Sequence, residues 1–211
     1  MRLTVFGATG GVGQEIVRQA LAAGHEVTAV VRDPARLPDG LVGAPAHALV
    51  PLGGEAAVRS AVAGRDAVLS GLGARSRKPG GVVERLTGQV LRAMEAAGTR
   101  RLLVVSAAPV GPEQADDPLP DRLARKVLGT VLGEVYADLA RMEAALARSA
   151  ADWTSVRPPR LTNGPRTGVY RTVVDGTPRR GRSLSRADVA DAMLALIDDP
   201  AAVRRGVGVA Y

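Results

Sequence analysis

The sequence predicts an α/β fold built on a doubly wound parallel sheet, with a small irregular region near the C-terminus. Three observations lead to this prediction. Short apolar runs rich in β-branched residues alternate with longer stretches of helical period. A glycine-rich stretch joins the first apolar run to the first helical stretch, and a Pro-, Gly- and Arg-rich stretch interrupts the alternation near the C-terminus. Apolar runs separated by helices are typical of a parallel sheet covered on both faces.

The first half of the chain alternates strand and helix from its second residue onward. We expect strands at 2–6, 26–32 and 46–50, and helices at 12–24 and 55–64. In the first helix Ile16, Val17, Ala20 and Leu21 share one face, as a helix packed on a sheet requires. Gly24 is suited to the left-handed conformation that commonly ends a helix.

The second half continues the same alternation. We expect strands at 66–73, 101–108 and 152–158, and helices at 82–98, about 120–149, and 185–198. In the last helix Ser185 can act as the N-cap, with Asp188 at the third helical position. The stretch 163–183 should add a short strand or two and a loop. Right-handed crossovers between such strands give a Rossmann-type fold.

The chain is expected to form a single domain over residues 1–211. This length is enough to bury a sizeable core, and the hydrophobic content of 46% argues against disorder. Two insertions, at about 109–135 and 160–183, are expected on the side of the domain where substrate binds.

The composition excludes several classes of site. Without any cysteine, the chain has no disulfide, no thiolate metal site and no cysteine nucleophile. No His, Asp or Glu spacing typical of a metal site stands out, so we expect no metal. The apolar runs are too short and broken to span a membrane, and the first strand leaves no room for a signal peptide. We therefore expect a cytoplasmic location and no membrane partner.

The net charge of +7 does not by itself indicate a nucleic-acid partner. Only Lys78 and Lys126 of the 28 basic residues are lysines, and the arginines are scattered along the chain. Aromatic residues, on which bases stack in many single-strand binders, make up 2% of the sequence. We interpret the basic residues as solvated surface and expect no nucleic acid.

The stretch VFGATGGVG, residues 5–13, carries the clearest functional signal. Its glycines follow the spacing G-x-x-G-x-x-G between a strand and a helix. Gly7 permits a tight turn, Gly10 lets the backbone approach a ligand closely, and Gly13 lets the helix pack on the strand. The free amides and the dipole of the helix N-terminus favour a phosphate. This context predicts a dinucleotide cofactor.

The end of the second expected strand selects the cofactor. NAD sites usually place a carboxylate there to bind the ribose hydroxyls. Here Arg32 ends the strand and Arg36 follows one helical turn later, and two guanidinium groups suit a 2′-phosphate. Asp33 could instead bind the ribose if Arg32 turns outward. We predict NADP(H) as the cofactor.

Five stretches together resemble the atypical short-chain dehydrogenase/reductase group, and within it the biliverdin reductase B, or flavin reductase, type. They are VFGATGGVG, VVRDPARL, GLGAR, VVSAA and DWTSVRPPRLTNGP, and the similarity covers nearly the whole chain. The resemblance implies a set of cofactor contacts. These are Gly7, Thr9, Gly10, Gly11, Val12 and Gly13 at the pyrophosphate, Arg32 and Arg36 at the 2′-phosphate, Leu72, Gly73 and Arg75 along the middle, and Ser106 and Pro158 near the nicotinamide.

The proton donor of many short-chain dehydrogenases, a Tyr-x-x-x-Lys pair, is absent. Tyr136 and Tyr170 are followed four residues later by Ala140 and Val174, and Tyr211 is the last residue. The flavin reductase type also lacks this pair, so its absence does not exclude hydride transfer. Such enzymes depend mainly on the positioning of the cofactor.

Ser106 and Arg160 are the candidate catalytic residues. Ser106 follows an inner strand and could bond the nicotinamide amide or a substrate carbonyl, or only satisfy the backbone of a loop. Arg160 could bind an anionic or carbonyl-bearing substrate, or be a surface residue. The enzymes that this chain resembles carry histidines near the substrate, where this sequence has Leu139 and Arg160.

The leading hypothesis is an NADPH-dependent oxidoreductase that transfers hydride to a small carbonyl, quinone or flavin-like substrate. One alternative is a non-catalytic NADP-binding redox sensor similar to NmrA-like regulators. Another is a tailoring epimerase or dehydratase that uses the nicotinamide transiently. The sequence leaves open the substrate, the proton donor, and whether the protein is a monomer or a homodimer.

Overall fold

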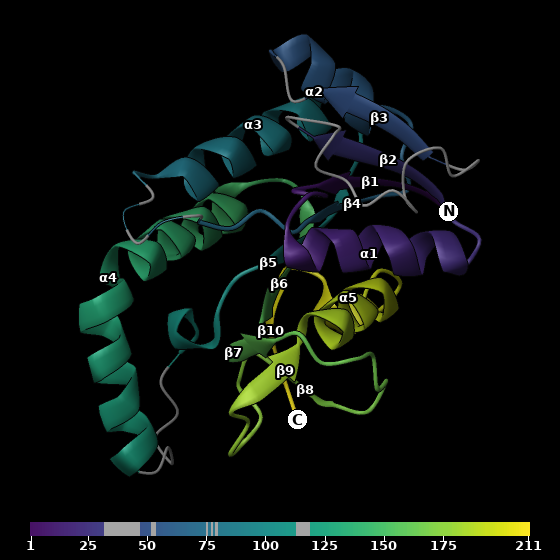
Figure 1. Ribbon diagram of the computed structural model, residues 1–211. Coiled ribbons are helices and arrows are strands. Elements are labelled where there is room, and N and C mark those ends of the chain that lie inside the picture. Colours follow the sequence, from purple (N-terminus) through teal and green to yellow (C-terminus); the bar gives the residue numbers. More distant parts are fainter. Residues whose placement is uncertain (32–46, 52–53, 75, 77, 79, 113–118) are drawn as a thin grey trace.

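An eight-stranded sheet forms the centre of the protein. The computed structural model describes residues 1–31, 47–51, 54–74, 76, 78, 80–112 and 119–211, with the backbone alone described for 47–51 and 119–131 (Figure 1). The strands of this sheet are β1 (Arg2–Phe6), β2 (Glu26–Val31), β3 (His47–Pro51), β4 (Ala67–Ser70), β5 (Arg101–Val105), β6 (Asp152–Arg157), β8 (Arg171–Val174) and β10 (Arg205–Ala210).

The strand order confirms the predicted doubly wound Rossmann-type fold. Across the sheet the order is β3-β2-β1-β4-β5-β6-β10-β8, and the first six strands follow the order of dinucleotide-binding sheets. All neighbouring pairs are parallel except β10 and β8, which are antiparallel. The chain reverses its direction of travel across the sheet between β1 and β4, and ligands of open α/β sheets bind at this point.

Helices cover both faces of the sheet. They are α1 (Gly11–Ala22), α2 (Glu55–Val62), α3 (Val82–Ala97), α4 (Leu119–Arg148) and α5 (Arg186–Ala195). Figure 1 shows α1 and α5 together on one face, and α2, α3 and α4 on the other. Helix α4 bends at Leu132, whose φ of −118° and ψ of 19° are not helical. Two short 3₁₀ turns, η3 (Ala108–Val110) and η4 (Pro200–Ala202), also lie in the described part of the chain.

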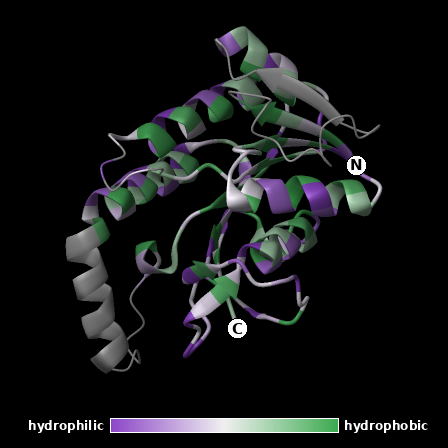
Figure 2. Cartoon of the chain, in the orientation of Figure 1, coloured by the Kyte–Doolittle hydropathy of each residue, from purple (hydrophilic) through white to green (hydrophobic). Residues whose placement is uncertain are grey.

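Each face of the sheet has its own apolar core, because side chains alternate along a strand. In β1, Leu3 and Val5 pack with α1 and α5, whereas Phe6 packs with α2, α3 and α4. Ile16 of α1 and Met94 of α3 are fully or almost fully buried in these two cores. Figure 2 shows hydrophobic residues along the central strands and hydrophilic ones on the outer surfaces of α1 and α3.

Most expected elements are confirmed, with shorter ends. Strand β4 stops at Ser70 rather than continuing to residue 73, although Gly71 N–H still donates to the Phe6 carbonyl of β1 at 2.9 Å. The predicted caps are also confirmed. Gly24 has a φ of +78°, and Asp188 N–H donates to Ser185 Oγ at 2.9 Å.

Strand β10 was not predicted, and its glycines explain why. Glycine is depleted in strands, so the segment carries little strand signal. Both glycines have close neighbours: a Cβ on Gly206 would lie 2.2 Å from Nη1 of Arg157, and one on Gly208 would lie 2.2 Å from the Gly176 carbonyl oxygen. Long-range packing therefore selects residues that disfavour a strand locally.

The C-terminal region is more regular than predicted. Strand β7 (Arg160–Thr162) pairs in parallel with β9 (Ser183–Ser185) in a separate two-stranded sheet, and β8 extends the main sheet. The buried Asp188 carboxylate holds the region together. It accepts hydrogen bonds from Thr167 N–H at 2.8 Å, Gly168 N–H at 2.9 Å and the Tyr211 hydroxyl at 2.6 Å.

Candidate functional site

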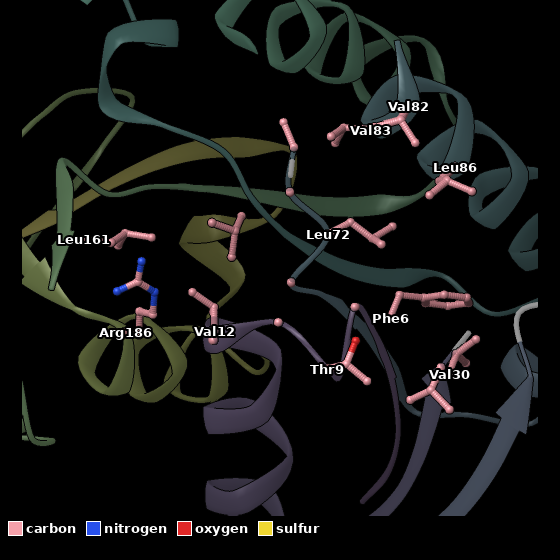
Figure 3. A pocket seen from close by; sticks show the side chains of 18 of the residues that line it. Phe6, Thr9, Val12, Val30, Leu72, Val82, Val83, Leu86, Leu161 and Arg186 are labelled. Atoms are coloured by element: carbon pink, nitrogen blue, oxygen red, sulfur yellow. The ribbon is translucent and has the colours of Figure 1, made fainter. Parts of the chain in front are cut away.

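A cavity of about 470 Å³ lies at the carboxyl ends of β1, β2 and β4, at the point where the strand order reverses (Figure 3). The glycine-rich loop between β1 and α1 forms one side, and the segment after β4 forms another. The first turns of α3 and a residue from each of β5, β7 and α5 complete the walls.

The glycine-rich loop presents free backbone amides to this cavity. Gly7 has a φ of +70°, which favours glycine, and its carbonyl accepts the Gly10 N–H at 2.8 Å. The first hydrogen bond of α1 runs from Gln14 N–H to the Gly10 carbonyl at 2.8 Å, so the amides of Gly11 and Val12 have no acceptor within the helix. The first turn of α1 holds no acidic residue. This helix start can therefore bind an anion.

Three backbone segments meet behind the loop without room for a side chain. A Cβ on Gly13 would lie 2.1 Å from the Gly7 carbonyl oxygen, and one on Gly71 would lie 2.9 Å from Gly13 N. A Cβ on Gly10 would lie 3.3 Å from the Gly7 oxygen. These contacts hold the helix start close to the ends of β1 and β4, as a dinucleotide cradle requires.

Seven of the predicted cofactor contacts line the cavity, whereas Gly13 does not. Among its lining residues are Gly7, Thr9, Gly10, Gly11, Val12, Leu72 and Gly73. Val30 and Val31, at the end of β2, also line it. Arg32 and Arg36, which follow β2, and Arg75 lie outside the described residues, so their contacts stay predictions.

An apolar wall faces the glycine-rich loop, and a buried carboxylate fixes its position. Leu86 and Val83 of α3 point toward the cavity (Figure 3). The fully buried carboxylate of Asp138 caps α3, accepting the amides of Val83 at 3.0 Å and Glu84 at 3.1 Å. Asp138 therefore has a structural role, and among the described residues no cluster of three His, Asp or Glu side chains could hold a metal.

The end of the cavity away from β2 lies close to the candidate catalytic residues. Val105 and Leu161 line it, but their neighbours Ser106, Pro158 and Arg160 do not. Ser106 is 6% exposed, and its hydroxyl lies close to the Glu143 carboxylate. Side chains alternate along β7, so the exposed Arg160 lies on the face opposite Leu161. The catalytic roles of Ser106 and Arg160 stay predictions.

A buried ion pair that the sequence did not indicate lies next to Ser106. Arg157 Nε donates to Glu143 Oε1 at 3.0 Å, and Ser155 Oγ donates to the same oxygen at 2.7 Å. Burial raises the pKa of Glu143, but the hydrogen bonds from Arg157, the nearby Ser106 hydroxyl and Ser155 outweigh it, leaving the pKa below its usual value. Glu143 is therefore an anion at neutral pH.

Arg186, the first residue of α5, is a further lining residue that sequence reasoning missed. Its Nη1 donates to Asn163 Oδ1 at 2.5 Å, and its side chain lies against the backbone of Gly11. No local pattern links Arg186 to the glycine-rich loop, because only the packing of α5 beside α1 brings them together.

The position where similar enzymes carry a histidine is part of the core. Leu139 of α4 is buried at 7% exposure, among the apolar residues that pack under α2, α3 and α4. It does not line the cavity.

Comparisons with known proteins agree with this geometry. The sequence profile of the NAD(P)H-binding family matches residues 7–200. A short-chain dehydrogenase/reductase from Veillonella parvula, solved in complex with NADP, has a TM-score of 0.83 at 18% identity, over 100% of this chain and 94% of the other. The oxidoreductase ylbE from Lactococcus lactis has a TM-score of 0.79 at 18% identity, over 100% and 90% of the two chains.

One curated relative has a named activity. It is the 3-diazoavenalumate denitrifying reductase of a Streptomyces species, 37% identical over 148 residues. The alignment covers 57% of this chain but only 43% of that protein, so this chain spans less than half the length of the relative. In the part of this chain that the structure describes, no helix has the length and apolar character needed to cross a membrane.

Proposed function

Because the chain belongs to the NAD(P)H-binding family, we propose that it is an NADPH-dependent oxidoreductase that transfers hydride to a small carbonyl, quinone or flavin-like substrate. Family membership and the shared fold confirm the predicted NAD(P)H cofactor and the place of the chain among atypical short-chain dehydrogenase/reductase proteins. The observation that carries the proposal is the glycine-rich loop, whose free amides face a cavity of about 470 Å³ at the switch point of the sheet.

The residues of the cavity fit a dinucleotide. The amides of Gly11 and Val12 would hold the pyrophosphate, and Val30 and Val31 would contact the adenosine half. Arg32 directly follows Val31, which supports 2′-phosphate recognition and hence NADP rather than NAD. A solved protein of the same fold contains NADP, which is consistent with this choice.

The opposite end of the cavity is suited to the substrate. The bound cofactor supplies a hydride there, and with one proton this completes a two-electron reduction. Val105 and Leu161 would exclude water, and the Ser106 hydroxyl beside Val105 would orient a substrate oxygen. The proton comes from solvent or from this hydroxyl. Tyr170 donates to Asp191 at 2.7 Å and Tyr211 to Asp188, and the half-buried Tyr136 packs against the apolar core under α2, α3 and α4.

The test is the oxidation of NADPH in the presence of a panel of candidate acceptors. The loss of nicotinamide absorbance monitors the reaction. The panel contains aldehydes, ketones, quinones, FMN and an aromatic diazo compound, the last because the Streptomyces relative is named as a reductase of 3-diazoavenalumate. We expect steady oxidation with at least one class. Tight NADPH binding with no turnover on any of them would instead favour the redox-sensing regulator, which the missing Tyr-x-x-x-Lys pair supports.

The choice of NADP is tested by Arg32→Ala. Hydrogen bonds to charged groups contribute about 1.5–3 kcal/mol, so NADPH affinity should fall about tenfold to a hundredfold. Affinity for NADH, which lacks the 2′-phosphate, should be unchanged. Calorimetric titration with both cofactors measures the ratio of the NADPH and NADH affinities. The matched control is Arg18→Ala, because Arg18 is exposed and pairs with Glu15. An equal loss for both cofactors, or none, would contradict 2′-phosphate recognition.

A further inference from the structure

Arg186 lies where the C-terminal region meets the glycine-rich loop. Its Cδ is 2.7 Å from the position that a Cβ on Gly11 would occupy, so its side chain fills the space that this glycine leaves open. Figure 3 shows the guanidinium group beside Val12 and Leu161 at the edge of the cavity. A cationic group thus lies against the backbone of the helix start.

The positive charge of Arg186 has no carboxylate partner among the described residues. Its described acceptor is the neutral amide oxygen of Asn163, at 2.5 Å. Other arginines of this part of the molecule pair with acids: Arg166 contacts Asp191 at 2.5 Å, and Arg157 pairs with Glu143. Since the first turn of α1 also lacks an acidic residue, the site combines a fixed cation with free amides.

We propose that Arg186 is a cofactor-binding residue that contacts the pyrophosphate, and that Asn163 positions its guanidinium group. The planar fork of a guanidinium matches the oxygens of a phosphate and can bind two of them. An anion held by the amides of Gly11 and Val12 is within reach of a side chain that lies against Gly11. This inference rests on the cofactor part of the proposed function and not on hydride transfer.

The proposal gives the C-terminal region a role in binding the cofactor. Asn163 follows β7, whose Leu161 lines the cavity, and Arg186 follows β9, which pairs with β7. The two-stranded sheet therefore sets the place of both residues relative to the glycine-rich loop. A change in this sheet should alter cofactor affinity as well as substrate binding.

The first test compares ligands with and without a pyrophosphate. Arg186→Ala should weaken NADPH and NADH by the same factor, about tenfold to a hundredfold, because both contain the pyrophosphate. Its affinity for adenosine 2′-monophosphate, which lacks the pyrophosphate, should be unchanged. Arg186→Lys keeps the charge but not the fork and should recover part of the loss. Arg18→Ala removes the same charge elsewhere on the surface and should change none of these affinities.

Titration calorimetry and nicotinamide fluorescence measure these affinities without turnover. A protein that binds NADPH but reduces nothing would contradict hydride transfer and leave the role of Arg186 intact. Three results would overturn that role. They are unchanged NADPH affinity in Arg186→Ala, an equal loss for adenosine 2′-monophosphate, and a loss confined to the KM of an anionic substrate.

A second test moves Arg186 without removing it. Alanine at position 11 would place its Cβ 2.7 Å from the Arg186 Cδ and displace the side chain, while its backbone has no positive φ to strain. We expect Gly11→Ala to weaken NADPH several-fold in the wild-type background and to have little further effect in Arg186→Ala. Equal effects in both backgrounds would mean that the methyl group itself obstructs the cofactor, and would contradict the proposed contact.

Discussion

At the scale of single residues, the Arg157–Glu143 pair shows how one interaction can serve several elements. The two side chains are only 11% and 12% exposed. Glu143 connects α4 to β6 through Arg157 and Ser155, and it lies near Ser106 at the end of β5. The same guanidinium group lies over β10 and occupies the space above Gly206. The pair therefore connects elements that lie next to the candidate catalytic residue Ser106.

Replacing Glu143 should destabilise the protein in a pH-dependent way. Glu143→Ala leaves a buried, unpaired arginine, and we expect a loss of about 3 kcal/mol near neutral pH. The pKa of Glu143 is lowered in the folded protein. Its contribution to the free energy of unfolding is therefore complete above the pKa that Glu143 has in the unfolded chain. The contribution is lost as the pH falls through the folded pKa, so the wild type and the variant should converge in acid.

Urea unfolding followed by the fluorescence of the single tryptophan, Trp153, measures this difference at several pH values. Glu15→Ala is the control, because Glu15 pairs with the exposed Arg18 on α1 and such pairs contribute about 1 kcal/mol or less. A destabilisation by Glu143→Ala that stays constant into acid would contradict the ion pair.

At the scale of elements, the position of α1 depends on glycine. Gly13 of α1 contacts Gly7, which follows β1, and Gly71, which follows β4, through backbone atoms. This approach directs the helix start at the cavity, and with it the free amides of Gly11 and Val12. The anion site is thus a consequence of how one helix packs on two strand ends.

Gly13→Ala should disrupt this packing. The added Cβ would lie 2.1 Å from the Gly7 carbonyl oxygen, and backbone atoms cannot yield as a flexible side chain can. We expect a destabilisation of about 3 kcal/mol or more, together with weaker NADPH binding.

Gly88→Ala is the matched control for Gly13→Ala. At Gly88, in the middle of α3, a Cβ would make only an ordinary contact of 3.6 Å with Arg92. The higher helix propensity of alanine should stabilise that variant by about 0.5–1 kcal/mol. Thermal unfolding distinguishes the two, and equal effects would contradict the close approach of α1.

The elements also show what a local pattern can predict. Strands β1 and β5 and helices α1 and α3 have strong periodicity or uniform apolar runs, and the structure confirms them. Strand β10 contains two glycines, and Arg157 and Gly176 occupy the space that a side chain on them would need. The local sequence pattern therefore does not predict strand β10.

At the scale of the whole molecule, the C-terminal segment is an integral part of the sheet. Strand β10 lies between β6 and β8, and its residues Val207 and Val209 are fully buried. The hydroxyl of Tyr211 donates to Asp188, which also holds residues 167–168 and the start of α5. The end of the chain thus supports the region that carries Arg186.

Removal of residues 205–211 should abolish the native fold. Without β10, the strand β8 has no partner, and the apolar core beneath α5 is exposed. We expect loss of the cooperative unfolding transition, measured by circular dichroism and urea titration. Removal of Tyr211 alone should leave a cooperative but less stable protein, since Asp188 keeps its bonds to Thr167 and Gly168. A truncated chain with a native transition would contradict the central place of β10.

The sequence by itself determined the doubly wound fold, the glycine-rich cradle and the nicotinamide cofactor. Short stretches of sequence are enough to predict these properties, because helix and strand periods and the G-x-x-G-x-x-G spacing each involve residues close together in the chain. Only the tertiary structure decided the place of β10, the Arg157–Glu143 pair, and the contact between Arg186 and Gly11. Each of these depends on the packing of residues that are distant along the chain. A local pattern cannot predict which distant side chain will fill the space that a glycine leaves.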